Sequence, residues 1–165
     1  MKKIMLTLLL VMFCNISYAE IIRDNNSFDN SKIIVSCFYS KNIEIPEPAP
    51  REIAFKKEIS SYGNDYYMFI KTNDSQKYWI LTSEDTKIKF DNNKIIKTQT
   101  QSDNNPVKAK LSFHVTQEML SEISNTQTLS IQIPFFSSKA IQTEYVVYNI
   151  PKLVIDEWKQ VIEMN

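Results

Sequence analysis

The chain of 165 residues contains a single glycine, Gly63. Phosphate-binding loops, dinucleotide-binding turns and the nucleophile elbow of α/β-hydrolases each need several glycines, because the backbone must approach a ligand closely or adopt positive φ. The sequence therefore excludes these enzyme classes. Turns must use Asn and Asp, which tolerate the left-handed conformation. We expect chain reversals at Asn25-Asn26, Asp29-Asn30, Gly63-Asn64-Asp65, Asn73-Asp74, Asp91-Asn92-Asn93 and Asp103-Asn104-Asn105-Pro106.

Side chains that bind transition metals are also scarce, with one histidine, His114, and two cysteines, Cys14 and Cys37. A zinc site needs three or four Cys, His or acidic ligands held together, so we expect no metal and no other cofactor. Cys37 and His114 could in principle form a nucleophile and its base. However, Cys37 lacks a nucleophile motif and His114 falls on the lysine-bearing face of a regular strand. We therefore predict no catalytic residue.

An excess of basic charge is missing as well, since 19 Lys and Arg face 19 Asp and Glu. Proteins that bind nucleic acid or anionic lipid cluster basic residues on one face. The balanced composition gives no sign of such a cluster. We expect no nucleic-acid partner.

The N-terminus carries the most informative pattern in the chain. Lys2 and Lys3 precede an apolar run over residues 4–13, and small residues occupy Ser17 and Ala19, which is typical of a secretory signal peptide. The run is too short for a membrane-spanning helix, which needs about 20 apolar residues. We predict a signal peptide over residues 1–19, cleavage after Ala19, and a periplasmic or secreted product without a transmembrane anchor.

Cys14 permits a second interpretation, in which this cysteine is lipidated and anchors the protein. Lipoprotein signals place a small residue directly before the cysteine, and here that residue is Phe13. Lipid anchoring is therefore disfavoured. After cleavage only Cys37 remains, so no intramolecular disulfide can form, and we predict that Cys37 is buried and unreactive.

After the signal, we predict a flexible N-terminal segment over residues 20–30 and one globular domain over residues 31–165. Apolar residues recur with a period of two, which indicates β-strands. We predict one hairpin that joins residues 66–72 to 77–82, with Ile70 opposite Trp79, and a second hairpin that joins 87–90 to 94–98. Both faces of the first hairpin are apolar, so we expect it near the centre of the fold.

The second half shows the clearest elements. Residues 108–115 alternate strictly, Thr116 can cap a helix that reaches about Ile123, and a strand over 129–133 is stopped or placed at an edge by Pro134. A strand over 144–150 leads to Pro151, which opens a last helix with an apolar stripe of Val154, Trp158, Val161 and Ile162. We predict an α+β fold of mostly antiparallel sheet, with about seven or eight strands and two short helices in the C-terminal half. The alternative is an all-β sandwich or barrel with a packed C-terminal helix.

Aromatic side chains are densest over residues 62–79. An exposed group of them could form a protein-binding hot spot or stack on sugar rings, whereas their alternation also fits a covered core. We single out as possible partner-binding residues Tyr62, Tyr66, Tyr67, Tyr78 and Trp158. Nothing else in the sequence supports glycan binding.

We therefore predict a non-enzymatic envelope protein that binds another envelope or secreted protein, such as an immunity or inhibitor protein or an accessory subunit of an envelope assembly. The alternative is a small envelope hydrolase that uses acidic residues, for which the candidates are Glu44, Glu47, Glu52 and Glu84-Asp85. An enzyme would gather acids with shifted pKa values in a concave pocket. A binding protein would expose an apolar patch or a strand edge.

Overall fold

The computed structural model describes residues 18–25, 31–39, 48, 50–73, 77–105 and 108–165. Within these residues it contains eleven strands, in two antiparallel sheets, and two helices late in the chain. The predicted class, a mostly antiparallel α+β fold with two late helices, is confirmed. The strands are more numerous than the predicted seven or eight.

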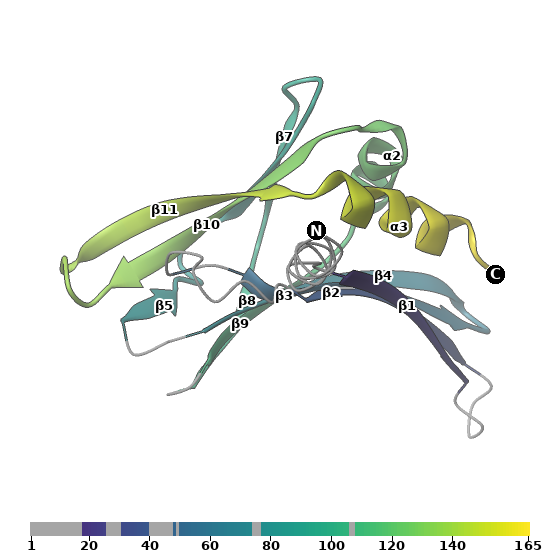
Figure 1. The fold of residues 1–165 in the computed structure, drawn as a ribbon, viewed down its shortest axis with the longest axis horizontal. Helices are drawn as coiled ribbons and strands as arrows, with labels where there is room; N and C mark the ends of the chain where they lie inside the picture. Colours follow the sequence, from purple (N-terminus) through teal and green to yellow (C-terminus); the bar gives the residue numbers. More distant parts are fainter. Residues whose placement is uncertain (1–17, 26–30, 40–47, 49, 74–76, 106–107) are drawn as a thin grey trace, which may run out of the picture.

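The larger sheet has six strands in the order β1-β2-β3-β4-β9-β8. In Figure 1 this sheet curves like an arch, and α3 lies over its convex side. Alternate side chains on that side, such as Phe55, Met68 and Leu111, are each 0% exposed and form half of the core. The bounds are β1 Tyr18–Asn25, β2 Lys32–Tyr39, β3 Pro50–Ser60, β4 Gly63–Asn73, β9 Lys108–His114 and β8 Gln101–Asn105.

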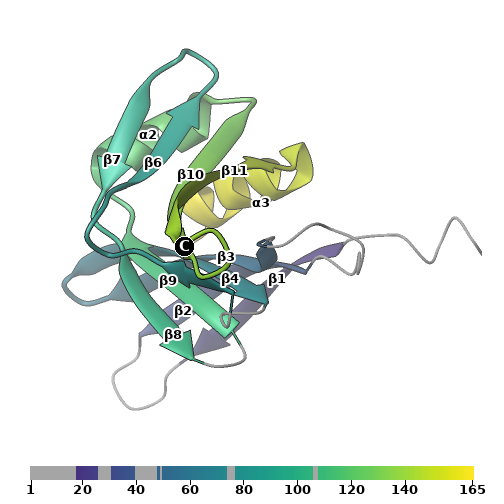
Figure 2. The same ribbon diagram turned by 90° about the vertical axis from the view of Figure 1, so that its left-hand side faces the viewer.

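The second sheet has the order β11-β10-β6-β7, and β5 pairs with the far end of β10. Its β6–β7 hairpin projects away from the six-stranded sheet (Figure 2). The turn of this hairpin has Asn93 at φ 63°, so the predicted hairpin and its Asn-Asp turn are confirmed. The bounds are β5 Tyr78–Ile80, β6 Thr86–Phe90, β7 Ile95–Thr98, β10 Leu129–Ser137 and β11 Gln142–Ile150.

Both predicted helices are present. Helix α2 (Gln117–Asn125) begins where the Thr116 hydroxyl accepts a 3.3 Å hydrogen bond from the backbone N–H of Met119, which satisfies one of the open donors of the first turn. Helix α3 (Lys152–Glu163) packs on β1, β2 and β3. Its Trp158 is 0% exposed and stacks on Phe55, with ring centroids 5.4 Å apart. The predicted apolar stripe therefore closes the core.

The C-terminal end of α3 is fixed by a buried lysine. Lys57 on β3 is 1% exposed, and its Nζ donates hydrogen bonds to the backbone carbonyls of Ile162, at 3.0 Å, and of Met164. Carbonyls in the last turn of a helix have no partner within the helix, and the helix dipole favours a cation there. Lys57 supplies both the donors and the charge.

The predicted hairpin between residues 66–72 and 77–82 is wrong. Strand β4 pairs along its length with β3 and β9, whereas β5 pairs with β10 in the other sheet, so that Trp79 lies opposite Phe136 rather than Ile70. Two long neighbours already occupy both edges of β4. The three-residue β5 therefore finds its partner far along the chain.

Pro134 does not stop or border its strand, because β10 continues to Ser137 as a central strand. In an antiparallel strand the N–H and C=O of one residue point to the same neighbour. The Pro134 carbonyl accepts from Leu81 N–H at 3.0 Å, so the position that lacks an N–H faces the gap between the ends of β5 and β6. The missing N–H of Pro134 therefore costs the sheet no inter-strand hydrogen bond.

The structure describes residues 20–25 of the predicted flexible N-terminal segment over residues 20–30 as part of a strand. Residues 20–25 belong to β1, which pairs in register with β2 from Tyr18 opposite Tyr39 to Asn25 opposite Lys32. Strand β8, formed by polar residues that we expected in a turn, pairs with β9. No helix among the described residues has the length and apolar content needed to span a membrane.

Candidate functional site: the outer face of the second sheet

The second sheet has one face in the core and one face that no other described element covers. Alternate residues of β6 and β10, among them Ile88, Ile131 and Phe135, are at most 1% exposed and point into the core. The residues between them point the other way, because successive side chains of a strand alternate. We call this second set the outer face, and it contains Trp79, Lys87, Lys89, Ile95, Lys97, Phe136, Tyr145 and Val147.

One end of the outer face is an apolar patch formed by Trp79, Phe136, Tyr145 and Val147. The Trp79 and Phe136 rings lie 5.9 Å apart, and Tyr145 lies opposite Pro134, two residues from Phe136. Trp79 is 49% exposed, Tyr145 51% and Val147 54%. Single exposed apolar residues are ordinary, whereas a group of them from three strands makes this patch a candidate interaction surface.

Tyr145 is held in place within the patch. Its hydroxyl donates a hydrogen bond to Glu84, and the Lys87 ammonium lies 5.8 Å from its ring centroid. The hydrogen bond to Glu84, then burial and the negative charge of Glu84, raise the pKa of the Tyr145 phenol above its ordinary value. The ring is thus anchored at its polar end and leaves an apolar side open to solvent.

The other end of the outer face is a lysine cluster formed by Lys87, Lys89 and Lys97. Lys87 lies directly opposite Lys97 in the β6–β7 register, and Lys89 follows two residues along β6. Among the residues that the structure describes, none provides an ion-pair partner for these three lysines. Like charges directly opposite in a sheet repel each other, so this arrangement lowers the stability of the isolated protein.

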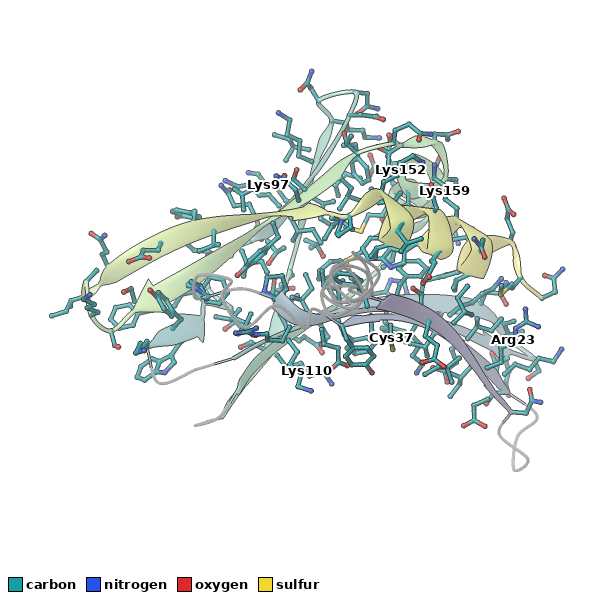
Figure 3. The ribbon with its side chains drawn as sticks, viewed as in Figure 1. Arg23, Cys37, Lys97, Lys110, Lys152 and Lys159 are labelled. Carbon is teal, nitrogen blue, oxygen red and sulfur yellow. The ribbon has the colours of Figure 1, made fainter. Side chains whose placement is uncertain are left out.

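The six-stranded sheet also has an outer face, which points away from α3. It differs from that of the second sheet, because its charged and aromatic side chains contact one another. Lys56 lies 5.4 Å over the Tyr67 ring, Lys110 lies 4.9 Å over the Phe69 ring, and Lys56 also pairs with Glu58 at 2.7 Å. Lys56, Glu58, Tyr67 and Phe69 border a shallow hollow of about 550 Å³, which His114 also lines. Figure 3 shows Lys110 on the side of the sheet away from α3.

The fold has a solved counterpart. It is similar to the crystal structure of invasion associated protein B from Bartonella henselae, with a TM-score of 0.52 and 9% sequence identity, over 90% of this chain and 100% of that one. At this identity the likeness concerns the fold alone. No protein-family model matches the sequence, and no curated protein matches it.

The five tyrosines and tryptophans singled out from the sequence do not form one site. Trp158 is 0% exposed and Tyr66 6%, so both side chains lie in the core. Tyr78 is half-buried with its ring edge against Phe135. Tyr62 is 99% exposed at the β3–β4 turn, and Tyr67 lies on the outer face of the six-stranded sheet.

Sequence reasoning missed the apolar patch because it placed Trp79 opposite Ile70. Phe136, Tyr145 and Val147 also depend on the β10–β11 pairing for their proximity. A usable signal existed in the alternation of β11, where Tyr145, Val147 and Asn149 share one face.

Two of the acidic candidates, Glu52 and Glu84, make structural contacts, whereas the Asp85 side chain has no ion pair or hydrogen bond with another described residue. Glu52 pairs with Lys71 at 2.8 Å and Glu84 accepts from Tyr145, while Glu44 and Glu47 lie outside the described residues. Asp91 and Glu122 have lowered pKa values, chiefly because Gln127 N–H donates to Asp91 and Lys94 donates to Glu122. A lowered pKa is the opposite of what a general acid needs.

The remaining candidates for chemistry lie apart from an organised site. Cys37 is 7% exposed, and burial raises the pKa of its thiol, as expected for an unreactive cysteine. His114 is an exposed strand residue whose Nε2 lies 3.5 Å from Asp65 Oδ1. The described residues include no group of three His, Cys, Asp or Glu that could hold a metal ion.

Proposed function

We propose that the protein is exported to the periplasm or cell surface, is cleaved after Ala19, and acts there without catalysis by binding another protein. The binding surface is the outer face of the second sheet. An immunity or inhibitor protein and an accessory subunit of an envelope assembly both act in this way.

The observation that carries the proposal is the apolar patch. Trp79, Tyr145 and Val147 are each about half exposed, yet they share one face of the sheet, with Trp79 on one side of β10 and the other two on its other side. Binding energy in protein interfaces concentrates in Trp and Tyr anchors of this kind. Complete burial of such a side chain stabilises a complex by roughly 1.5–3 kcal/mol relative to full exposure, so a patch already half covered contributes a fraction of that for each residue.

Export rests on the sequence of the N-terminus, and the structure adds one constraint to it. The proposed cleavage after Ala19 falls inside β1, and it leaves the pairs from Glu20–Cys37 to Asn25–Lys32 intact. The mature protein therefore keeps its edge strand. The structural similarity to an invasion associated protein is compatible with a function of this protein outside the cytoplasm.

The export part is tested by fractionation of the native cells and N-terminal sequencing of the full-length gene product. We expect material in the periplasmic or extracellular fraction whose first residue is Glu20. An intact Met1 on cytosolic protein contradicts this part of the proposal.

The binding part is tested with the double variant Trp79→Ala/Tyr145→Ala. After cross-linking in native cells, purification of the tagged wild-type protein should recover a second protein in a fixed ratio to it. Purification of the variant should not recover this protein. Tyr62→Ala is the matched control, because Tyr62 is 99% exposed but stands alone at a turn. Equal recovery by all three proteins, or turnover of envelope glycan or peptide by the purified protein with no partner recovered, overturns the proposal in favour of another surface or a hydrolase.

A further inference from the structure

We infer that the partner is an acidic protein, which places a cluster of carboxylates on Lys87, Lys89 and Lys97 while its apolar surface covers Trp79, Phe136, Tyr145 and Val147. This inference rests on the proposed function and specifies the chemistry of the partner. It makes the outer face a two-part site, with one apolar end and one cationic end.

Lys87 and Lys97 lie directly opposite each other in the β6–β7 register. Residues directly opposite in an antiparallel pair have Cβ atoms roughly 4.5–5.5 Å apart, so Lys87 and Lys97 hold two positive charges close together. Lys89 adds a third charge on the same face, beside Ile95, which is 54% exposed. Carboxylates from a partner would attract the lysines and would also reduce the repulsion between them, so both effects favour the complex.

The rest of the chain supplies a second argument. Lys71 also lies opposite a lysine, Lys110, in the β4–β9 register, but there Glu52 from the same chain meets Lys71 at 2.8 Å. In the same way Lys94 has Glu118 and Glu122 at 2.9 and 2.7 Å. The lysine cluster has no such acid among the described residues, and we assign that role to the partner.

Two other occupants fit less well. A second copy of the chain across a two-fold axis would bring lysine clusters together or press them on apolar patches. An anionic membrane would attract the three lysines. However, the apolar patch would then have to enter the lipid interface, and Tyr145 holds the negatively charged Glu84 at that end. A protein can match both ends, because it can place its own donors near Glu84.

The first experiment uses poly-L-glutamate as an acidic polypeptide probe and the double variant Lys89→Glu/Lys97→Glu. These two lysines are exposed, and Lys87 is kept because it packs on Tyr145. The matched control is Lys32→Glu/Lys110→Glu, which makes the same change in net charge at exposed positions elsewhere. We expect binding that weakens with added NaCl and falls at least about tenfold in the first variant only. No binding by the wild type, or equal losses in both variants, overturns the inference.

The second experiment uses the protein recovered by cross-linking. Its affinity should fall about tenfold or more for Lys89→Glu/Lys97→Glu, and exchange of its interface acids for lysine should restore binding to that variant. If Trp79→Ala/Tyr145→Ala abolishes binding but the lysine variant does not, the inference fails while the proposed function stands. If neither variant matters, both fail. Binding to phosphatidylglycerol vesicles but not phosphatidylcholine vesicles, lost in the lysine variant with no protein recovered, replaces the acidic protein with a lipid surface.

Discussion

The outer faces of the two sheets use the same kinds of side chain in opposite ways. On the six-stranded sheet, Lys56 and Lys110 lie over aromatic rings, and Glu58 pairs with Lys56. On the second sheet, lysines and aromatic residues separate to opposite ends, and the contact of Lys87 with Tyr145 joins them. The first face satisfies its own groups, whereas the second leaves apolar area and positive charge open. Exposed aromatic side chains therefore do not identify an interface by themselves, and the charged groups around them must also lack partners within the protein.

The two tryptophans give the sharpest test of which aromatic residues support the fold. Trp158→Ala should lower the free energy of unfolding by about 3–5 kcal/mol, because it empties a large space in a close-packed core. Trp79→Ala should lower it by less than about 1 kcal/mol, because half of that side chain already lies in water. Urea unfolding monitored by circular dichroism measures both. Similar losses for the two variants would contradict the assignment of Trp79 to an outer face.

A second test contrasts a lysine that stabilises the fold with one that does not. Lys57→Met should cost about 1–3 kcal/mol of stability, because it leaves the Ile162 and Met164 carbonyls without their buried donor. Lys89→Met, at an exposed position, should change stability by less than about 0.5 kcal/mol. Thermal and urea unfolding give both values. A neutral Lys57→Met would show that water replaces the donor.

A third test concerns the repulsion within the lysine cluster. Lys97→Glu converts a like-charge pair with Lys87 into an opposite-charge pair, so it should raise stability by about 0.2–1 kcal/mol at low salt while it weakens partner binding. Added NaCl should shrink the gain in stability. A loss of stability would mean that Lys87 and Lys97 already share an anion.

The smallest expected effect is a pH dependence from Tyr145. Its pKa is raised in the folded protein, so the fold holds the phenolic proton more tightly than the unfolded chain does. The contribution to stability is therefore complete below the ordinary tyrosine pKa of about 10 and is lost as pH rises through the folded value. Ultraviolet titration of wild type and Glu84→Gln checks this, since the amide should lower the pKa of Tyr145. An unchanged titration would show that the Glu84 contact is absent in solution.

Sequence reasoning found the elements whose signals are local. Strand β9, the Thr116 cap of α2, the stripe on α3 and the turn at Asn93 each follow from residues within a few positions of one another. It failed where pairing is long-range. The choice of β10 as the partner of β5 depends on which strand edges remain open after the whole sheet forms, and no local pattern encodes that.

The candidate site divides in the same manner. The opposition of Lys87 and Lys97 follows from the predicted hairpin and its turn, so the lysine cluster was within reach of the sequence. The apolar patch was not, because Trp79 meets Phe136 only through the β5–β10 pairing. The charge balance of the whole chain also concealed a local excess of basic charge on one face.

Helix α3 is the last described element of the chain, and its Trp158 fills the space against Phe55 between the helix and the six-stranded sheet. The core is therefore incomplete until α3 has been synthesised and has packed on the sheet. Under the proposed export, the strands that precede α3 would cross the membrane before the core can form. A product that stops before α3 would lack Trp158, would leave this side of the core exposed, and would be cleaved early by proteases.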